Sequence, residues 1–119
     1  MNARAVLCLI VLSSGMGAVT ACGGGPRVAL DPKSKAFYET ASLIMTREES
    51  RIFKLLSDVE SRQEFIDDFW AKRDPNADTD INEFRSEFEQ RVAYAGKRFI
   101  GEGRRGWDTD RGRIYIFMG

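Results

Sequence analysis

An apolar segment that ends just before Cys22 limits how much of this chain can fold as a domain. Arg4 is the only charged side chain before it, and residues 5–19 contain none. At 15 residues, with serines and glycines among them, the segment is shorter than the roughly 20 apolar residues of a membrane-spanning helix. This order of regions is typical of a cleaved secretory signal. Cleavage before Cys22 leaves 98 residues, which must fold around one small core.

The residues around the expected cleavage point carry a second signal. Ala21 followed by Cys22 resembles the end of a bacterial lipoprotein signal. The resemblance implies that residues 1–21 are removed and that Cys22, acylated with chains such as palmitate, becomes the N-terminus. Gly23 stands where aspartate would resemble an inner-membrane retention signal, which favours the outer membrane. We therefore expect a lipid-anchored protein of the cell envelope, facing the periplasm.

Composition excludes several classes of site. Without residues 1–21 the chain has 17 basic and 18 acidic residues, which gives no electrostatic reason to expect nucleic acid or anionic lipid as a partner. The chain has no histidine, Cys8 is removed and Cys22 is acylated, so Ser–His or Cys–His nucleophiles, His/Cys zinc sites and disulfides are excluded. Residues 78–89 match a calcium loop only in part, because Glu83 stands where glycine is needed. We expect no metal and no cofactor.

The remaining sequence divides into a tether and a mostly helical domain. Residues 22–33 are glycine-rich and then contain proline, as in a flexible tether, and residues 34–119 form the expected domain. Capping patterns and apolar residues at spacings of three and four predict three or four short amphipathic helices. The first helix begins at Asp31-Pro32 and ends near Met45, the second begins at Thr46, the third begins at Ser57 and stops at Arg73-Asp74-Pro75, and the fourth runs from about Glu83 to Ile100.

The last residues predict a β-strand, which makes the expected fold class α+β. Ile114, Ile116 and Met118 alternate with Tyr115 and Phe117. A lone strand has no ladder partner, so either another molecule supplies one or the natural chain continues beyond Gly119, and we favour the second. The unpaired edge would suit strand addition by a protein partner. The residues of this interaction edge are Arg113, Ile114, Tyr115, Ile116 and Phe117.

Before the expected strand lies the most distinctive stretch of the chain, residues 106–116. Gly106, Trp107, Thr109 and Asp110 resemble the motif that names the GWxTD domain family of bacterial envelope proteins. The segments 69–75, 82–84 and 91–95 resemble that family too, so the likeness covers roughly residues 37–119. It implies an envelope compartment but no mechanism, and it implies further domain after the strand.

The motif itself has a structural and a catalytic interpretation. In the structural one, Trp107 packs against the helices, Asp108 and Asp110 accept hydrogen bonds from nearby backbone N–H groups, and Gly112 takes a positive φ before the strand. In the catalytic one, the two aspartates form an acid/base pair or a metal-binding pair, and Arg111 holds an anionic substrate. The structural interpretation is favoured because each residue type suits a turn without a ligand. The motif residues are Gly106, Trp107, Thr109, Asp110, Arg111 and Gly112.

Taken together, these patterns favour a non-catalytic binding or interaction module held at the membrane through Cys22. The first alternative is an envelope hydrolase that uses Asp108 and Asp110. The second is that residues 22–119 are the N-terminal part of a larger lipoprotein whose function lies downstream. No sequence feature identifies a small-molecule substrate.

Overall fold

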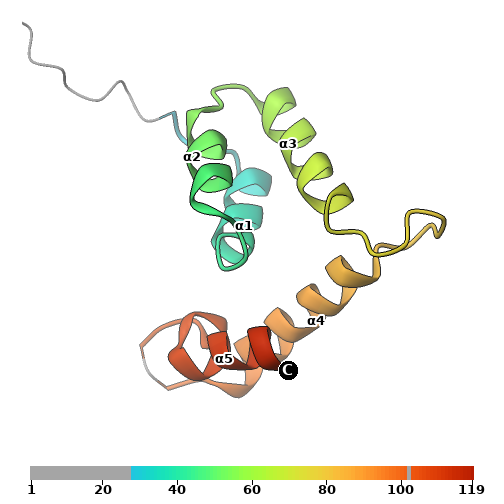
Figure 1. Cartoon of the computed structure of the whole chain (residues 1–119). Helices are drawn as coiled ribbons and strands as arrows, with labels where there is room; N and C mark the ends of the chain where they lie inside the picture. Colours follow the sequence, from blue (N-terminus) through green and yellow to red (C-terminus); the bar gives the residue numbers. More distant parts are fainter. Residues whose placement is uncertain (1–27, 102) are drawn as a thin grey trace, which may run out of the picture.

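The computed structural model describes residues 28–101 and 103–119, and every regular element in those ranges is a helix (Figure 1). There are five α-helices in this part of the chain, and a single 3₁₀ turn, η1, precedes the last of them. Their bounds are α1 Pro32–Ala41, α2 Arg47–Leu55, α3 Val59–Ala71, α4 Glu83–Arg98, η1 Gly106–Asp108 and α5 Asp110–Met118.

Side-chain caps fix where the helices begin. At α2, Thr46 Oγ1 accepts a hydrogen bond from the Glu49 N–H at 3.1 Å, and the Glu49 carboxylate accepts one from the Thr46 N–H at 2.8 Å. This capping box confirms the start predicted from the sequence. The first helix begins as expected, at Pro32, but ends at Ala41 and not near Met45. The third is capped by Asp58, one residue later than predicted, and the fourth by Asn82.

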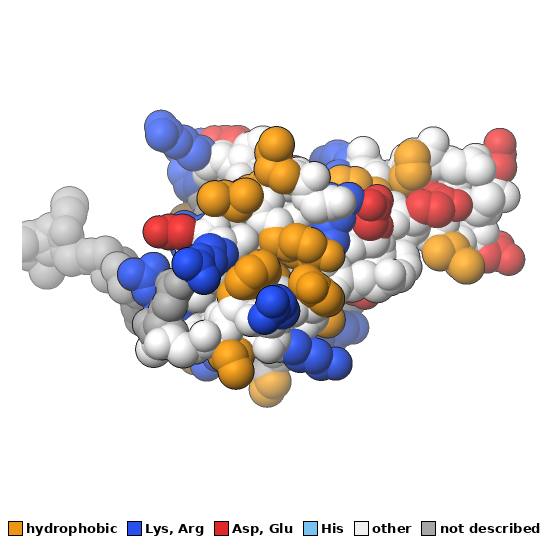
Figure 2. All heavy atoms as spheres, turned by 90° about the horizontal axis from the view of Figure 1, so that it is seen from below, with side chains coloured by type: hydrophobic (Ala, Val, Ile, Leu, Met, Phe, Trp, Pro, Cys, Tyr) orange, Lys and Arg blue, Asp and Glu red, His pale blue; other side chains and the backbone are white. Residues whose placement is uncertain are grey.

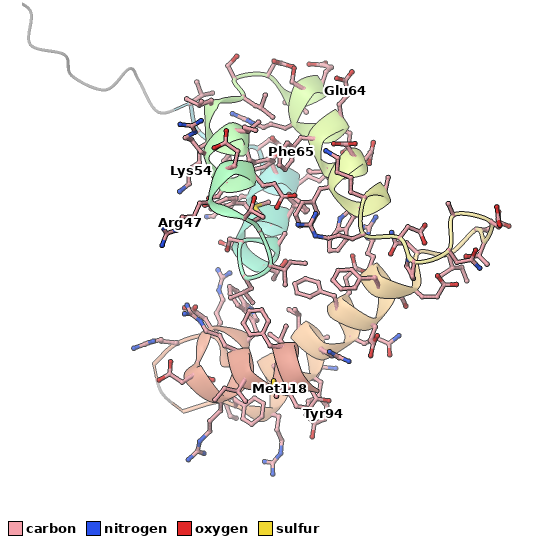
Figure 3. The ribbon with its side chains drawn as sticks, viewed as in Figure 1. Arg47, Lys54, Glu64, Phe65, Tyr94 and Met118 are labelled. Carbon is pink, nitrogen blue, oxygen red and sulfur yellow. The ribbon has the colours of Figure 1, made fainter. Side chains whose placement is uncertain are left out.

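An aromatic core joins the first three helices, which lie together in Figure 1. The fully buried Phe53 of α2 lies beside Phe37 of α1, with ring centroids 5.5 Å apart. Phe65 points from α3 toward the same rings, as Figure 3 shows, with its centroid 5.3 Å from that of Phe53. Trp70, at the end of α3, extends the core to Phe88 of α4 at 5.8 Å. These aromatic side chains are therefore core residues, at the helical spacing that the sequence shows.

Two arginines hold this core to the surrounding backbone. Arg62 is only 2% exposed, and its guanidinium donates to the Leu56 carbonyl at 3.0 and 3.1 Å and to Asp31 Oδ1 at 3.3 Å. Arg73 stacks over the Phe69 ring, 3.7 Å from its centroid, and donates to Glu49 Oε2 at 2.8 Å. A charge this close to the core is stable only when its hydrogen bonds are made, so both arginines fix how α2 and α3 pack.

The Arg73–Glu49 pair gives stability an acid-sensitive component. The hydrogen bond from Arg73 lowers the pKa of Glu49 below its ordinary value of 4.5. Because the folded pKa is the lower one, this stabilisation is complete above the unfolded pKa and is lost as pH falls through the folded pKa. We expect Glu49→Gln to lower the free energy of unfolding by up to about 1 kcal/mol near pH 7 and by much less near pH 3. Urea denaturation at both pH values tests this, and an unchanged difference would contradict it.

The predicted C-terminal strand, and with it the α+β class, is wrong. Residues 110–118 form α5, which packs against the second half of α4 (Figure 1). The buried residues of α5 are Gly112 and Ile116, four apart, as on one helix face, and Ile114 and Met118 are exposed. A short run in which every residue is apolar fits a strand and a helix equally, and tertiary packing decides between them. The residues of the expected interaction edge are therefore helical and present no sheet edge, so strand addition loses its basis.

Candidate functional site

The site begins with close contact between Gly106 and the end of α4. A Cβ atom added at Gly106 would overlap the Ala95 carbonyl oxygen and lie 2.9 Å from those of Gly96 and Phe99. These carbonyls belong to the last turn of α4 and its C-cap, Phe99. Only glycine lets the chain come this near them. Gly106 therefore seats η1 directly on the C-terminal turn of α4.

Gly112 allows a second close approach, that of α5 to η1. A Cβ atom there would overlap the Gly106 carbonyl oxygen and lie 2.9 Å from the Trp107 Cα. The backbones of α4, η1 and α5 thus stack through two glycines that the motif holds six residues apart. The predicted positive φ at Gly112 is wrong, since Gly112 lies inside α5 and the glycines with positive φ among the described residues are Gly101 and Gly103.

The Thr109 side chain forms hydrogen bonds to both glycines. Its side chain is fully buried, and its hydroxyl donates to the Gly106 carbonyl at 2.7 Å and accepts from the Gly112 N–H at 3.0 Å. The second bond is the N-cap of α5. The acceptors predicted for nearby backbone N–H groups were Asp108 and Asp110, whereas the acceptor at the start of α5 is Thr109. A threonine ahead of an acidic residue is an N-cap signal that could have identified it.

Trp107 lies half-buried beside this stack. Its ring covers Gly96 of α4, where an added Cβ would be 3.6 Å from the Trp107 Cδ1. The Arg105 guanidinium lies 5.6 Å from the ring centroid on the solvent side. Trp107 therefore packs between α4 and a basic loop, at the edge of the hydrophobic core that includes Ala95 and Ile116.

The two aspartates of the catalytic interpretation occupy different surroundings. Asp108 Oδ1 accepts a hydrogen bond from Arg113 Nη2 at 2.6 Å, so its partner is a side chain and not the backbone. Asp110 is exposed in the first turn of α5, where a negative charge suits the positive end of the helix dipole. Arg111 is also exposed, and it lines a different part of the surface. The structure does not gather the two aspartates and Arg111 into one cavity.

An open groove of about 570 Å³ lies between the motif and α1. From the motif side it is lined by Trp107, Asp108 and Arg113 and by the loop residues Arg104 and Arg105, and from the α1 side by Tyr38, Glu39 and Ser42. Glu39 and Arg105 form an ion pair across it, and the hydrogen bond from Arg105 lowers the pKa of Glu39. The groove therefore offers paired charges, an indole and hydroxyl groups, a surface suited to binding polar partners.

The predicted signal segment and acylation site cannot be compared with the structure. Cys22 and the signal segment lie outside the described residues. Within residues 28–101 and 103–119, no helix has the length and apolar character needed to cross a bilayer. In the same ranges, no three side chains of the metal-ligating types His, Cys, Asp and Glu come together.

Comparison with known proteins identifies the family and nothing finer. No curated protein and no solved structure matches the chain. The family model of the GWxTD domain matches residues 26–119, which include all five α-helices and the glycine–threonine stack. The residues that name the family are thus the ones that hold α5 on α4, and the chain belongs to the GWxTD domain family.

Proposed function

We propose that this protein is a lipid-anchored module of the bacterial cell envelope that acts by binding and not by catalysis. The observation that carries the proposal is the use of the motif's polar groups inside the fold. Thr109 bonds to Gly106 and Gly112, and Asp108 bonds to Arg113. Because these groups serve to position α5, the motif fixes the shape of the surface beside it. That surface is the groove facing α1.

The anchor is proposed from the sequence at residues 5–22. The uncharged segment 5–19 and Ala21-Cys22 fit a lipoprotein signal, and residues 23–31 then lead to α1. Gly23 supports the outer membrane as the destination, with the domain facing the periplasm. Acylation at Cys22 would keep the groove and α5 near a membrane surface, because the nine linking residues span at most about 32 Å when extended.

The hydrolase alternative has one observation in its favour and one against it. Asp108 lines the groove together with hydroxyl and guanidinium groups, as a catalytic carboxylate would. Asp110, its expected partner, is exposed on the first turn of α5 and is not among the residues that line the groove. An acid/base pair needs both carboxylates at one reacting centre. The binding module is therefore the better supported function.

Replacing the acylated cysteine tests the anchor. We expect the wild-type chain, made in its bacterial host, to take up labelled palmitate and to have the mass of residues 22–119 plus acyl groups in the detergent-extracted envelope. Cys22→Ser removes the thiol that forms the thioether link, so it should abolish labelling. Cys8→Ser is the matched control and should be labelled normally, because Cys8 lies in the segment removed. An unlabelled wild-type chain, or a labelled Cys22→Ser variant, would contradict the anchor.

A further inference from the structure

The outer side of α5 exposes large apolar side chains close together. Met118 is 83% exposed and Ile114 63%, one helical turn apart, and Ile100 beyond the end of α4 is 75% exposed. Ile114 and Met118 line an open hollow of about 400 Å³ with Phe99 and Tyr115. We call the four apolar side chains that line this hollow, Phe99, Ile114, Tyr115 and Met118, the apolar patch. Large side chains exposed together mark a surface that is covered in use.

Exposed basic residues occur at the apolar patch and in the chain segments next to it. Arg111 lines the same hollow, and Lys97 and Arg98 directly precede Phe99 in the chain, whereas Arg104 in the next loop lines the groove facing α1. All four are exposed, and none forms an ion pair with another described residue. Figure 2, which views the molecule from this end, shows apolar side chains gathered with lysines and arginines around them, and most acidic side chains in view lie toward the start of α4.

The charge of the chain is divided in the same way. Residues 94–119 contain six basic and three acidic side chains, a net charge of +3, whereas residues 28–93 contain ten and fifteen, a net charge of −5. The near-zero charge of the whole chain hides this asymmetry. An anionic partner is therefore attracted to the α4–α5 end and repelled from the α1–α3 end.

We propose that the apolar patch and its basic rim dock on an anionic lipid surface. The outer side of α5 has the properties of a helix that lies in a membrane interface, with aliphatic side chains to enter the acyl boundary and arginines to meet phosphate groups. Charge complementarity favours anionic lipid over a second copy of the chain, because two α4–α5 ends would bring like charges together. The inference extends the proposed function, since the anchor at Cys22 would hold the domain beside the bilayer.

A fluorophore on the patch tests the docking in the intact acylated protein. The probe is NBD, attached at Met118→Cys, and the control position is Glu64→Cys at the opposite end of the molecule (Figure 3). Both proteins are reconstituted in phosphatidylcholine vesicles with or without about 30 mol % phosphatidylglycerol. We expect a blue-shifted, lipid-quenchable signal at position 118 that requires phosphatidylglycerol, and no such change at position 64.

Charge reversal then tests the basic rim. Arg111→Glu is expected to lower the ratio of docked to free domain by about fivefold or more, the contribution of one basic side chain at an anionic surface. About 0.5 M salt should have a similar effect. A signal at position 118 that is the same in both lipids, or that depends only on protein density, would overturn the proposal, the latter by assigning the patch to a second copy. The mass of the reconstituted protein reports acylation separately, so failure of the anchor and failure of docking are distinguishable.

Discussion

Replacing Gly112 with alanine is expected to lower the free energy of unfolding by about 3 kcal/mol, because the new methyl group has no space. It would overlap the Gly106 carbonyl oxygen and lie within 3.0 Å of the Gly106 carbonyl carbon and the Trp107 Cα. All of these atoms are backbone, so none can rotate away. Alanine is favoured over glycine in a helix by about 1 kcal/mol, which makes the predicted sign a strong test of the packing. Urea denaturation followed by circular dichroism measures the change.

Gly96→Ala is the matched control for this prediction. Gly96 lies inside α4, and a Cβ there would be 3.6 Å from the Trp107 Cδ1, an ordinary van der Waals distance. With space available, the same substitution is expected to stabilise the protein by about 0.5–1 kcal/mol. The two variants should therefore have opposite signs. A Gly112→Ala protein as stable as the wild type would show that α5 does not rest on Gly106.

Loss of packing at Gly112 need not unfold the whole domain. Ile116 of α5 joins the buried cluster of α1–α3, but the ring contacts of Phe53 with Phe37 and Phe65 involve no residue of α5. α5 and η1 can therefore detach while these ring contacts remain. Hydrogen exchange distinguishes the two cases, because detachment exposes the amides of residues 110–118 and leaves those around Phe53 protected. We expect the Gly112→Ala variant to show this local pattern before global unfolding.

The helices up to Arg98 could be predicted because their signals are local. Thr46 and Asn82 cap within three residues, and the apolar spacing of α4 repeats along its own length. The strand predicted at residues 113–118 is wrong because tertiary contacts, and not the local pattern, decide the structure there. Their apolar alternation is also local, but the helix is decided by contact with α4, by the Thr109 cap and by Arg91 of α4, which donates to the Ile116 carbonyl at 3.2 Å.

The candidate site was predictable in its residues but not in their roles. The motif indicated a structured turn, and that turn exists as η1 and the first turn of α5. The sequence predicts a positive φ at Gly112, whereas the structure uses Gly112 and Gly106 for close contact between backbone segments, which no single segment reveals. Similarly, the buried Arg62 depends on Asp31, 31 residues away, a contact that the position of Arg62 within α3 does not reveal.

Thr109→Val is the second prediction with a large effect, a loss of about 2 kcal/mol. Valine has nearly the shape of threonine, so the packing around this fully buried side chain is kept and only the hydroxyl is removed. That removal leaves the Gly112 N–H without its cap acceptor and the Gly106 carbonyl without its donor at 2.7 Å. Both groups are buried where water cannot replace the lost bonds. Chemical denaturation measures the loss.

Thr40→Val makes the same atomic change where it is expected to have little effect. The Thr40 hydroxyl lies inside α1 and donates to the Phe37 carbonyl at 3.3 Å, a contact that satisfies no free end of the helix. We expect a change within about 0.5 kcal/mol there. If the two variants lost equal stability, the effect would come from valine in a helical protein and not from the cap. A loss confined to Thr109→Val, with exposure of the α5 amides, would identify the threonine of the motif as the residue that holds α5 on α4.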